Sequence, residues 1–480
     1  MSTPSRLVLA IAFLVVGVLS NVDSTDIRES NNKAIGMLDR SWEAYGGQAI
    51  NTLQLSMRVS GEIMHETQSW TALPPFERYP LHADIKINQT TRRQAVTFET
   101  EIAGDFRFPS RFVLVEGKGF LTDPLLKTYE ETTDEHFLFD ILFPHRRIEQ
   151  AKQNKTSLRY VTADSFSYAT GGQVFTLQLD PTTHLVQRFQ QVVSMGINGD
   201  GCREYEFHNY TSVRGVKVPQ RIVIRNHNAV HGLIENVYNV QDLSPDALFD
   251  SKELELPAGF KKADHGYRGS FKINELSKDV YALENVTETT GQWSYNVFFV
   301  VFDEFVLVAE APVSSSVSEK VLAKIHEIAP GKKIRYLVQS HHHGDHIGGI
   351  RPYIADQVTI LAGPGMIPFI EKIAAAPFLL SPDRLSHQPQ KPVLEAVAAS
   401  KIVEDGNHRA VVYNVGPSPH ARDMLIVHLP KEKILYQSDL INEGEYPANK
   451  TTEHFLQKLK DLNIQANRVV GLHGKIVSRP

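Results

Sequence analysis

The sequence predicts an α+β protein, with a mostly antiparallel β domain and its N-terminal helix preceding a second, layered domain. Three observations predict this fold class. A helical repeat near the N-terminus is followed by short alternating segments up to about residue 243, and strands and helices then alternate from about residue 270 to the end. The length of 480 residues suggests two domains, and 42% hydrophobic with 22% charged residues is typical of soluble globular proteins. We therefore expect a leader over residues 1–24, a β-rich domain over residues 25–260 and a layered domain over residues 270–480.

The first 24 residues predict a secretory signal peptide. Arg6 precedes an apolar run from Leu7 to Leu19, and no acidic residue occurs before Asp23. The run is short for a bilayer span, although an uncleaved N-terminal anchor is the alternative. No second long apolar stretch follows, so we expect a secreted or periplasmic protein whose mature form has no stable membrane span.

The net charge and the cysteine content limit which partners and which metal ligands we expect. A formal net charge of −5, without a run of Lys and Arg, argues against nucleic acid as a partner. The single cysteine, Cys202, cannot form an internal disulfide. Any metal site must therefore be built from His, Asp and Glu, which favours zinc, manganese or iron.

The N-terminal segment from Asp26 to Gly46 has the period of an amphipathic helix, with apolar residues at spacings of three and four. Beyond it, segments rich in Val, Ile, Phe, Tyr and Thr alternate with turn residues, which indicates antiparallel strands. No catalytic constellation occurs in this part of the sequence. The expected strands include residues 53–60, 83–87, 94–101, 112–116, 174–179, 185–193 and 216–225.

A long helix followed by such a sheet, beginning at "AYGG" and ending near "GVKVPQRIVI", resembles the curved half-barrel domains of bacterial lipoprotein carriers. The resemblance is one of layout and weak sequence similarity. It implies an apolar ligand in the N-terminal domain, and with it a carrier role for acyl chains.

A segment rich in Pro, Gly and charge, "LPAGFKKADHGYR" at residues 256–268, marks the expected domain boundary. After it we expect strands over residues 280–284, 296–302 and 305–310, and a helix over residues 317–328. A short strand over residues 334–339 leads directly into the most distinctive segment of the chain.

That segment is a histidine-rich loop at the end of a strand, where open α/β sheets usually bind ligands. His341 and His343 are two residues apart, so on extended backbone both point the same way and can bind one metal ion. His342 points away and is not expected to be a ligand. Asp345 and His346 can face a second ion, and the two glycines that follow let the backbone pass close to the site.

Three further candidate ligands follow downstream, each beside a short strand. His420 lies in "GPSPHARDMLIVHLP", Asp439 in "KILYQSDL" and His473 in "RVVGLHGK". A composite metal site needs this repeated placement at a sheet edge, and a chance His-rich surface tract would lack it.

The order H-x-H-x-D-H, then His, then Asp, then Gly-x-His-Gly resembles the metallo-β-lactamase-fold superfamily over about residues 270–480. The resemblance implies a four-layer αββα sandwich with a dinuclear metal site at one edge of the paired sheets. It also implies that one ion is held by His341, His343 and His420, the other by Asp345, His346 and His473, and that Asp439 bridges them.

Two positions depart from the best-known zinc β-lactamases. Those enzymes have a Cys where this chain has Asp439, so the site is more similar to glyoxalase II and the general hydrolases of the superfamily. The usual supporting Asp near the second strand is here Glu310, in "VAEAP", which we interpret as a residue that supports the metal loop.

The expected function is metal-dependent hydrolysis of a small-molecule ester, thioester, amide, lactam or phosphoester, by a hydroxide that bridges two divalent ions. Zinc is the first expectation, with iron or manganese as alternatives, and Asp345 is the expected catalytic residue. Two other functions stay open: a single-iron oxidoreductase similar to persulfide dioxygenases, and a non-enzymatic carrier with a structural metal site. Asn296, Tyr353 and Ser418 lie near the motifs and are candidate substrate contacts, or else ordinary packing and loop residues.

Overall fold

The computed structural model describes residues 24–103, 106–124, 127–263, 271–287, 295–441, 449–473 and 476–478. The expected signal peptide lies outside the described residues, apart from its last residue. Part of the expected boundary segment, from residue 264 onward, also lies outside them.

Among the described residues, the N-terminal half forms one 14-stranded sheet, antiparallel except where β14 pairs in parallel with β6. Its strand order is β14-β6-β5-β4-β3-β2-β1-β13-β12-β11-β10-β9-β8-β7, so chain-distant strands β1 and β13 are neighbours. The strands are β1 (Gln54–Ile63), β2 (Tyr79–Asn88), β3 (Arg93–Ile102), β4 (Phe106–Val115), β5 (Lys118–Asp123), β6 (Thr128–Thr132), β7 (Arg159–Thr162), β8 (Ser165–Thr170), β9 (Gln173–Leu179), β10 (Val186–Ser194), β11 (Asp200–Val213), β12 (Val216–Asn228), β13 (Gly232–Ser244) and β14 (Lys261–Lys262).

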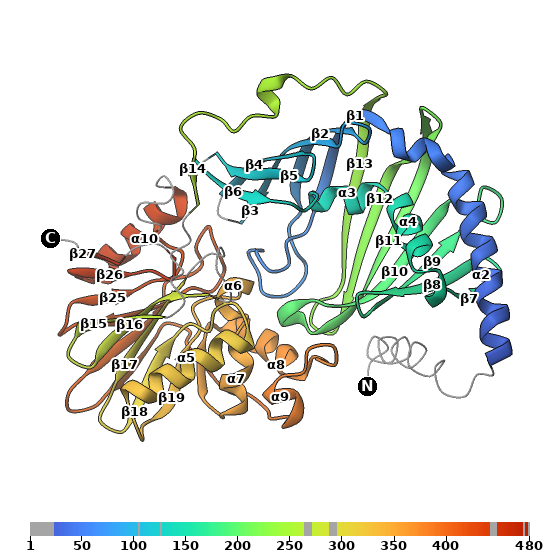
Figure 1. The fold of residues 1–480 in the computed structure, drawn as a ribbon. Coiled ribbons are helices and arrows are strands. Elements are labelled where there is room, and N and C mark those ends of the chain that lie inside the picture. Colours follow the sequence, from blue (N-terminus) through green and yellow to red (C-terminus); the bar gives the residue numbers. More distant parts are fainter. Residues whose placement is uncertain are drawn as a thin grey trace.

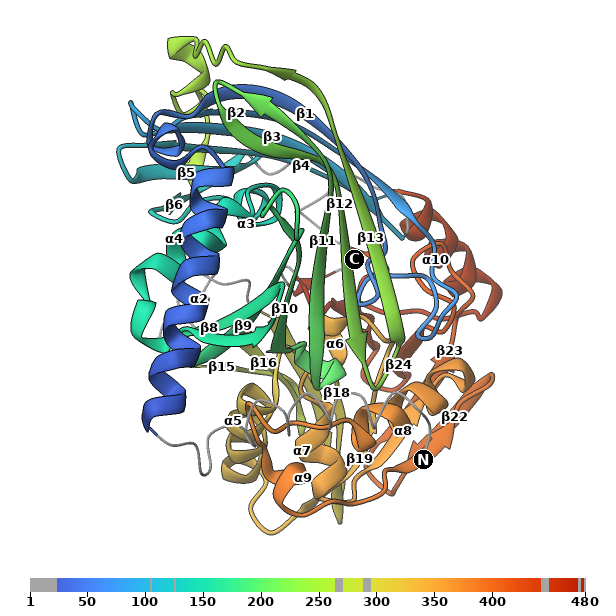
Figure 2. The ribbon, with the colours of Figure 1, turned by 90° about the vertical axis from the view of Figure 1, so that its right-hand side faces the viewer.

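This sheet curves around helices that cover its concave face (Figure 2). The helices are α2 (Ser24–Ala44), α3 (Phe137–Leu142) and α4 (His145–Gln153). Apolar residues of α2, such as Leu38, pack with α3, α4 and alternate strand residues in one core. The helix expected near the N-terminus is therefore present, and burial of its apolar stripe holds it to the sheet.

The C-terminal half contains two further sheets. The first has seven strands in the order β15 to β21, and the second has six strands in the order β22 to β27. The strands are β15 (Lys272–Ser277), β16 (Val280–Val286), β17 (Tyr295–Val301), β18 (Phe305–Ala309), β19 (Lys333–Val338), β20 (Thr359–Ala362), β21 (Val393–Ala396), β22 (Ser400–Glu404), β23 (Arg409–Asn414), β24 (Leu425–Leu429), β25 (Ile434–Tyr436), β26 (Arg468–Val470) and β27 (Val477–Ser478).

One apolar core contains residues of both sheets, including Phe298 of β17 and Val427 of β24. A second core joins the first sheet to helices on its other side, and a third joins the second sheet to α10. β17 and β18 are buried along nearly their whole lengths, as strands covered on both faces must be. The helices of this half are α5 (Ser315–Ile328), α6 (Gly344–Ile347), α7 (Ile350–Ala355), α8 (Ile367–Ala375), α9 (Arg384–His387) and α10 (Lys450–Asp461).

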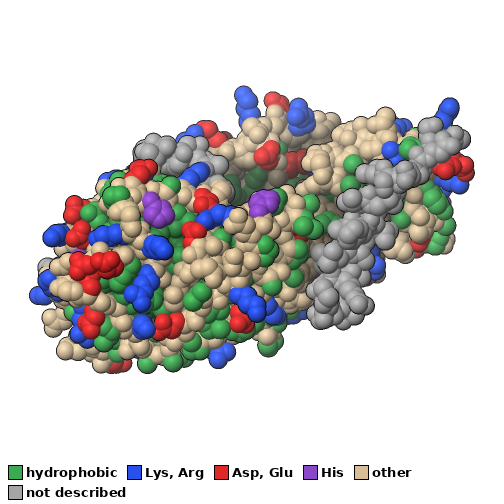
Figure 3. All heavy atoms as spheres, turned by 90° about the horizontal axis from the view of Figure 1, so that it is seen from below, with side chains coloured by type: hydrophobic (Ala, Val, Ile, Leu, Met, Phe, Trp, Pro, Cys, Tyr) green, Lys and Arg blue, Asp and Glu red, His purple; other side chains and the backbone are tan. Residues whose placement is uncertain are grey.

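The two halves lie against each other, with the open ends of several N-terminal strands facing α6 and α8 (Figure 1). Acidic and basic side chains are interspersed on the face seen from below, and no basic stripe runs across that face (Figure 3). Within the part of the chain that the structure describes, no helix combines the length and apolar character needed to cross a membrane.

Candidate metal centre

The histidine-rich loop begins where β19 ends, at the carboxyl edge of the parallel strands β18 to β20. His341, His343 and His346 have essentially no solvent exposure. The loop turns into the short helix α6, and Gly348 lets it approach a neighbouring segment, because an added Cβ would lie 2.2 Å from the Val313 carbonyl oxygen. Only glycine fits there without moving backbone, as expected from the sequence.

One group of potential metal ligands consists of His341, His343, His420 and Asp439, all buried, with one ligand atom from each within 4.8 Å of the others. The Nε2 atoms of His341 and His420 face each other at 3.2 Å. The Asp439 Oδ2 atom lies 3.3 Å from His420 Nε2 and 3.8 Å from His341 Nε2. Two ring nitrogens and a carboxylate oxygen thus converge on one point, as the ligands of a cation do.

The second group consists of Asp345, His346, Asp439 and His473, under the same distance limit. His346 Nε2 is 2.9 Å from Asp439 Oδ2, and His473 Nε2 is 3.1 Å from Asp345 Oδ2. The other oxygen of Asp439, Oδ1, lies 3.5 Å from His473 Nε2. Asp439 therefore belongs to both groups, and the structure brings together all seven residues that the sequence pattern picked out.

Two histidines of the first group, His341 and His343, are held neutral. Burial lowers the pKa of His341 well below its ordinary value, and the neighbouring histidines lower it further. The pKa of His343 is lowered in the same way, first by burial and then by His420. Neutral imidazoles carry the lone pairs that a metal ion needs, so this group is ready to bind a cation at neutral pH.

In the second group, interactions between charged side chains outweigh the effect of burial on the pKa values. Burial favours the neutral form of His346, but Asp439 and Asp345 outweigh it and raise the pKa of His346 well above 6.5. Burial is likewise outweighed at Asp345, where His346 and His473 hold the pKa of the carboxyl below its ordinary value. Two carboxylates in a buried site require positive charge beside them, which a divalent ion would supply.

Glu310 faces the His346 ring on the side opposite to Asp439. It is fully buried directly after β18, and its backbone has a φ of +79°, a conformation that is costly for a residue with a side chain. Gln339 Nε2 donates a hydrogen bond of 2.8 Å to Glu310 Oε2. Glu310 Oε1 faces His346 Nδ1 at 3.8 Å, and neither atom has a hydrogen-bond partner among the described residues. A small rotation of the His346 ring would pair them and leave Nε2 for a metal ion, which fits the expected supporting role.

The remaining sequence candidates have positioning or packing roles in this structure. Ser418 Oγ accepts the backbone N–H groups of His420 and Ala421 at 3.2 and 3.1 Å, which fixes the His420 loop. Asn296 donates its backbone N–H to the Leu472 carbonyl and its side-chain amide to the Gly471 carbonyl, which fixes the loop that carries His473.

Tyr353 lies in the apolar core behind the first sheet, and His342 belongs to neither ligand group. His342 instead lies beside the ring of Phe369, with the ring centroids 6.2 Å apart. Its side chain therefore points away from the ligand clusters, as its place in the alternating loop predicts.

One set of contacts, made by the loop between β1 and β2, could not be predicted from the sequence. Gln68 Nε2 donates a hydrogen bond of 2.9 Å to Asp345 Oδ1. The Ser69 carbonyl oxygen lies 3.0 Å from His343 Nε2. These partners are separated by 277 and 274 positions, and no motif in the loop marks it as part of a site.

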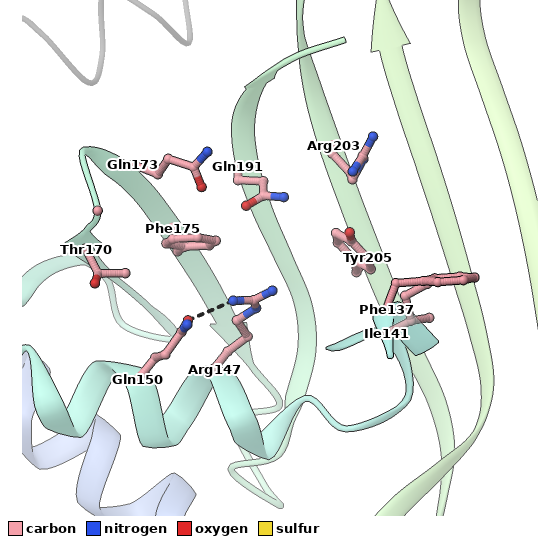
Figure 4. A pocket seen from close by; sticks show the side chains of 11 residues that line it. Phe137, Ile141, Arg147, Gln150, Thr170, Gln173, Phe175, Gln191, Arg203 and Tyr205 are labelled. Atoms are coloured by element: carbon pink, nitrogen blue, oxygen red, sulfur yellow. Dashed lines mark hydrogen bonds between the residues drawn. The ribbon is translucent and has the colours of Figure 1, made fainter. Parts of the chain in front are cut away.

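A separate pocket of about 540 Å³ lies inside the curved N-terminal sheet, between α3, α4 and β8 to β11 (Figure 4). The sequence resemblance predicted an apolar ligand here. The lining is mixed, however, because aromatic rings alternate with amide and guanidinium groups, and that prediction stays open. The lining residues are Phe137, Ile141, Arg147, Gln150, Thr170, Gly171, Gln173, Phe175, Gln191, Arg203 and Tyr205.

No protein-family profile and no curated protein sequence matches this chain. Solved structures of metallo-β-lactamases do match part of it. A structure of TMB-1 is 20% identical, covers 44% of this chain and 93% of its own, and has a TM-score of 0.33. A metallo-β-lactamase from Pontibacter korlensis is 18% identical, covers 44% and 94%, and has a TM-score of 0.33. The DIM-1 metallo-β-lactamase exposed to ceftazidime is 18% identical, covers 43% and 91%, and has a TM-score of 0.32. Part of the chain is thus similar to metallo-β-lactamases, and at these TM-scores any assignment of function rests on the side chains described above.

Proposed function

We propose that this protein is a metal-dependent hydrolase whose C-terminal half holds two divalent metal ions, with zinc as the first choice. The observation that carries the proposal is the convergence of seven side chains into two four-residue groups that share Asp439. A purely structural site would need only one closed set of four ligands. The two facing sheets with helices on their outer sides also fit the four-layer plan that the sequence resemblance implies.

Two divalent ions held in this way would supply water activated for attack at neutral pH and would polarise the carbonyl or phosphoryl group of a substrate. The first ion would be held by His341, His343 and His420, and the second by Asp345, His346 and His473. Asp439 would contact both ions, because its Oδ2 atom lies 3.3 Å from His420 Nε2 of the first group and 2.9 Å from His346 Nε2 of the second.

Asp345 is the proposed proton-handling residue. Its Oδ1 atom accepts a hydrogen bond from Gln68, and its Oδ2 atom faces His473. Held as a carboxylate, it can orient an attacking water by accepting a hydrogen bond from it and then take up its proton. Esters, thioesters, amides, lactams and phosphoesters all suit this chemistry, and the protein's own substrate is to be found among these classes.

The test is metal analysis of the purified full-length protein, followed by a hydrolysis screen with one probe of each class. We expect two zinc ions per chain and turnover of at least one probe. The His341→Ala/His343→Ala double variant should lose both metal and turnover. His342→Gln is the matched control, because it changes the adjacent histidine that faces Phe369 and should keep both.

Turnover by the double variant would refute the assignment. One iron per chain would instead favour the persulfide-dioxygenase-like alternative. Two ions bound without turnover of any probe would favour a carrier with a structural metal site.

A further inference from the structure

Three connections at one end of the N-terminal sheet are built into the C-terminal half. Ala72 from the β1–β2 loop, Ile197 from the β10–β11 turn and Val230 from the β12–β13 turn are all buried in the core behind the first C-terminal sheet. Lys372 Nζ of α8 also donates a hydrogen bond of 2.9 Å to the Val230 carbonyl oxygen. The two halves therefore share buried apolar surface instead of meeting only through a linker.

Of these connections, the β1–β2 loop lies against the metal centre itself. It descends from the sheet towards α6, as both views show (Figures 1 and 2). The Gly344 N–H donates to the Thr67 carbonyl oxygen at 3.0 Å, and the Arg422 N–H donates to the Trp70 carbonyl oxygen at 2.9 Å. Trp70 Nε1 donates to the Ser418 carbonyl oxygen at 2.8 Å. The loop is thus bonded both to the histidine-rich loop and to the loop that carries His420.

Two contacts from this loop reach metal-ligand candidates directly. The Ser69 carbonyl oxygen can only accept, so His343 carries its proton on Nε2 when this 3.0 Å bond forms. The other ring nitrogen, Nδ1, is then the one with a lone pair, and it is buried without a hydrogen-bond partner among the described residues. The loop therefore selects which nitrogen of His343 carries the lone pair that a metal ion needs.

Gln68 acts on Asp345 in a similar way. Its amide N–H donates a hydrogen bond of 2.9 Å to the Oδ1 atom of Asp345. The Oδ2 atom then lies 3.1 Å from His473 Nε2 and 3.5 Å from His346 Nε2. The loop is held in shape by its own bonds, because Ser69 Oγ donates to the Thr71 carbonyl at 2.7 Å. A preorganised donor of this kind fixes a carboxylate without competing for the ion.

We propose that the β1–β2 loop, residues 64–78, is an integral part of the metal centre and that Gln68 is a positioning residue that orients Asp345 for the second metal ion. This inference rests on the proposed function, since it concerns the same site. It gives the N-terminal half a role in metal binding, supplied by a segment some 270 positions away from the histidine-rich loop.

The experiment measures metal affinity in the full-length protein. Metal-depleted samples are titrated with zinc against a chromogenic chelator, and thermal unfolding of the metal-free samples checks that each variant is folded. Gln68→Ala removes the side chain, and Gln68→Met keeps its length and volume but has no donor. Gln187→Ala is the matched control, because Gln187 donates a bond of 2.8 Å to Asp180 on the exposed side of the N-terminal sheet.

We expect both Gln68 variants to bind the more weakly held ion about 10- to 100-fold less tightly, the usual effect of losing a partner of a metal ligand. Gln187→Ala should bind zinc as the native protein does. If Gln68→Met matches the native affinity, Gln68 only fills space and the proposal is wrong. If the native protein binds two ions and neither Gln68 variant is weakened, the inference fails while the proposed function stands. If the native protein binds no divalent ion, both fail.

Discussion

Replacing Glu310 with glutamine tests how this buried carboxylate, which faces His346 of the proposed metal centre, acts on that histidine. Glutamine keeps the size of the side chain and the bond with Gln339 can re-form through its carbonyl oxygen, but the negative charge facing His346 Nδ1 is lost. Loss of such a partner typically lowers metal affinity about 10- to 100-fold, which corresponds to about 1.4–2.7 kcal/mol. For a domain of this size the metal-induced rise in Tm should shrink by roughly 3–10 °C.

The assay is the same chelator competition, with thermal unfolding in the absence and presence of excess zinc. The matched control is Glu432→Gln, because Glu432 Oε1 contacts His408 Nδ1 at 2.9 Å in another buried Glu–His pair of the same half. The control should alter stability without altering zinc affinity. Native zinc affinity in Glu310→Gln would show that the charge of Glu310 does not support metal binding by His346.

Two further predictions concern stability. Arg351 bonds both carboxylate oxygens of Asp383, at 2.6 and 2.9 Å, so Arg351→Met should cost about 3–5 kcal/mol at pH 7 by urea unfolding. Burial opposes ionisation of Asp383, but Arg351 outweighs it and holds the pKa below its ordinary 3.8, so this contribution is present above pH 3.8 and is lost as the pH falls through the lower folded-state pKa. A cost that stayed the same as the pH is lowered from about 5 to about 2.5 would contradict this pairing. Burial lowers the pKa of His145 to about 4 from 6.5, so the unfolded chain takes up a proton between these values and stability falls as the pH drops through that window. His145→Leu should therefore lose about 2–3 kcal/mol less than the native protein between pH 7.5 and 4.5, and equal losses would show that His145 is not the buried neutral group.

Local sequence patterns predicted those parts of the fold that depend on local periodicity. The expected helix over residues 26–46 corresponds to α2, and the strand expected over residues 334–339 corresponds to β19. Each alternating segment expected in the N-terminal half overlaps an observed strand, although the ends differ by a few residues. The short helices α3 and α4 were not expected, because six and nine residues are too few to show a clear helical period.

Some residues of the candidate site could likewise be predicted from the sequence, and others could not. Its seven ligand candidates could be found because their residue types and their places beside strands follow a pattern along the chain. Gln68 and Ser69 could not, because a loop residue that bonds to a site 270 positions away leaves no local signal. The contact is a product of how the two halves pack, and packing between halves depends on shape complementarity that the order of residues does not display.

The most direct test of the account is the number of metal ions bound by the full-length protein, measured by elemental analysis after removal of loosely bound metal. We expect two divalent ions per chain, and one ion at most in an Asp439→Ala variant, because Asp439 belongs to both ligand groups. A native protein that binds no divalent ion, or a variant that still holds two with native affinity, would contradict the shared site on which the proposed function depends.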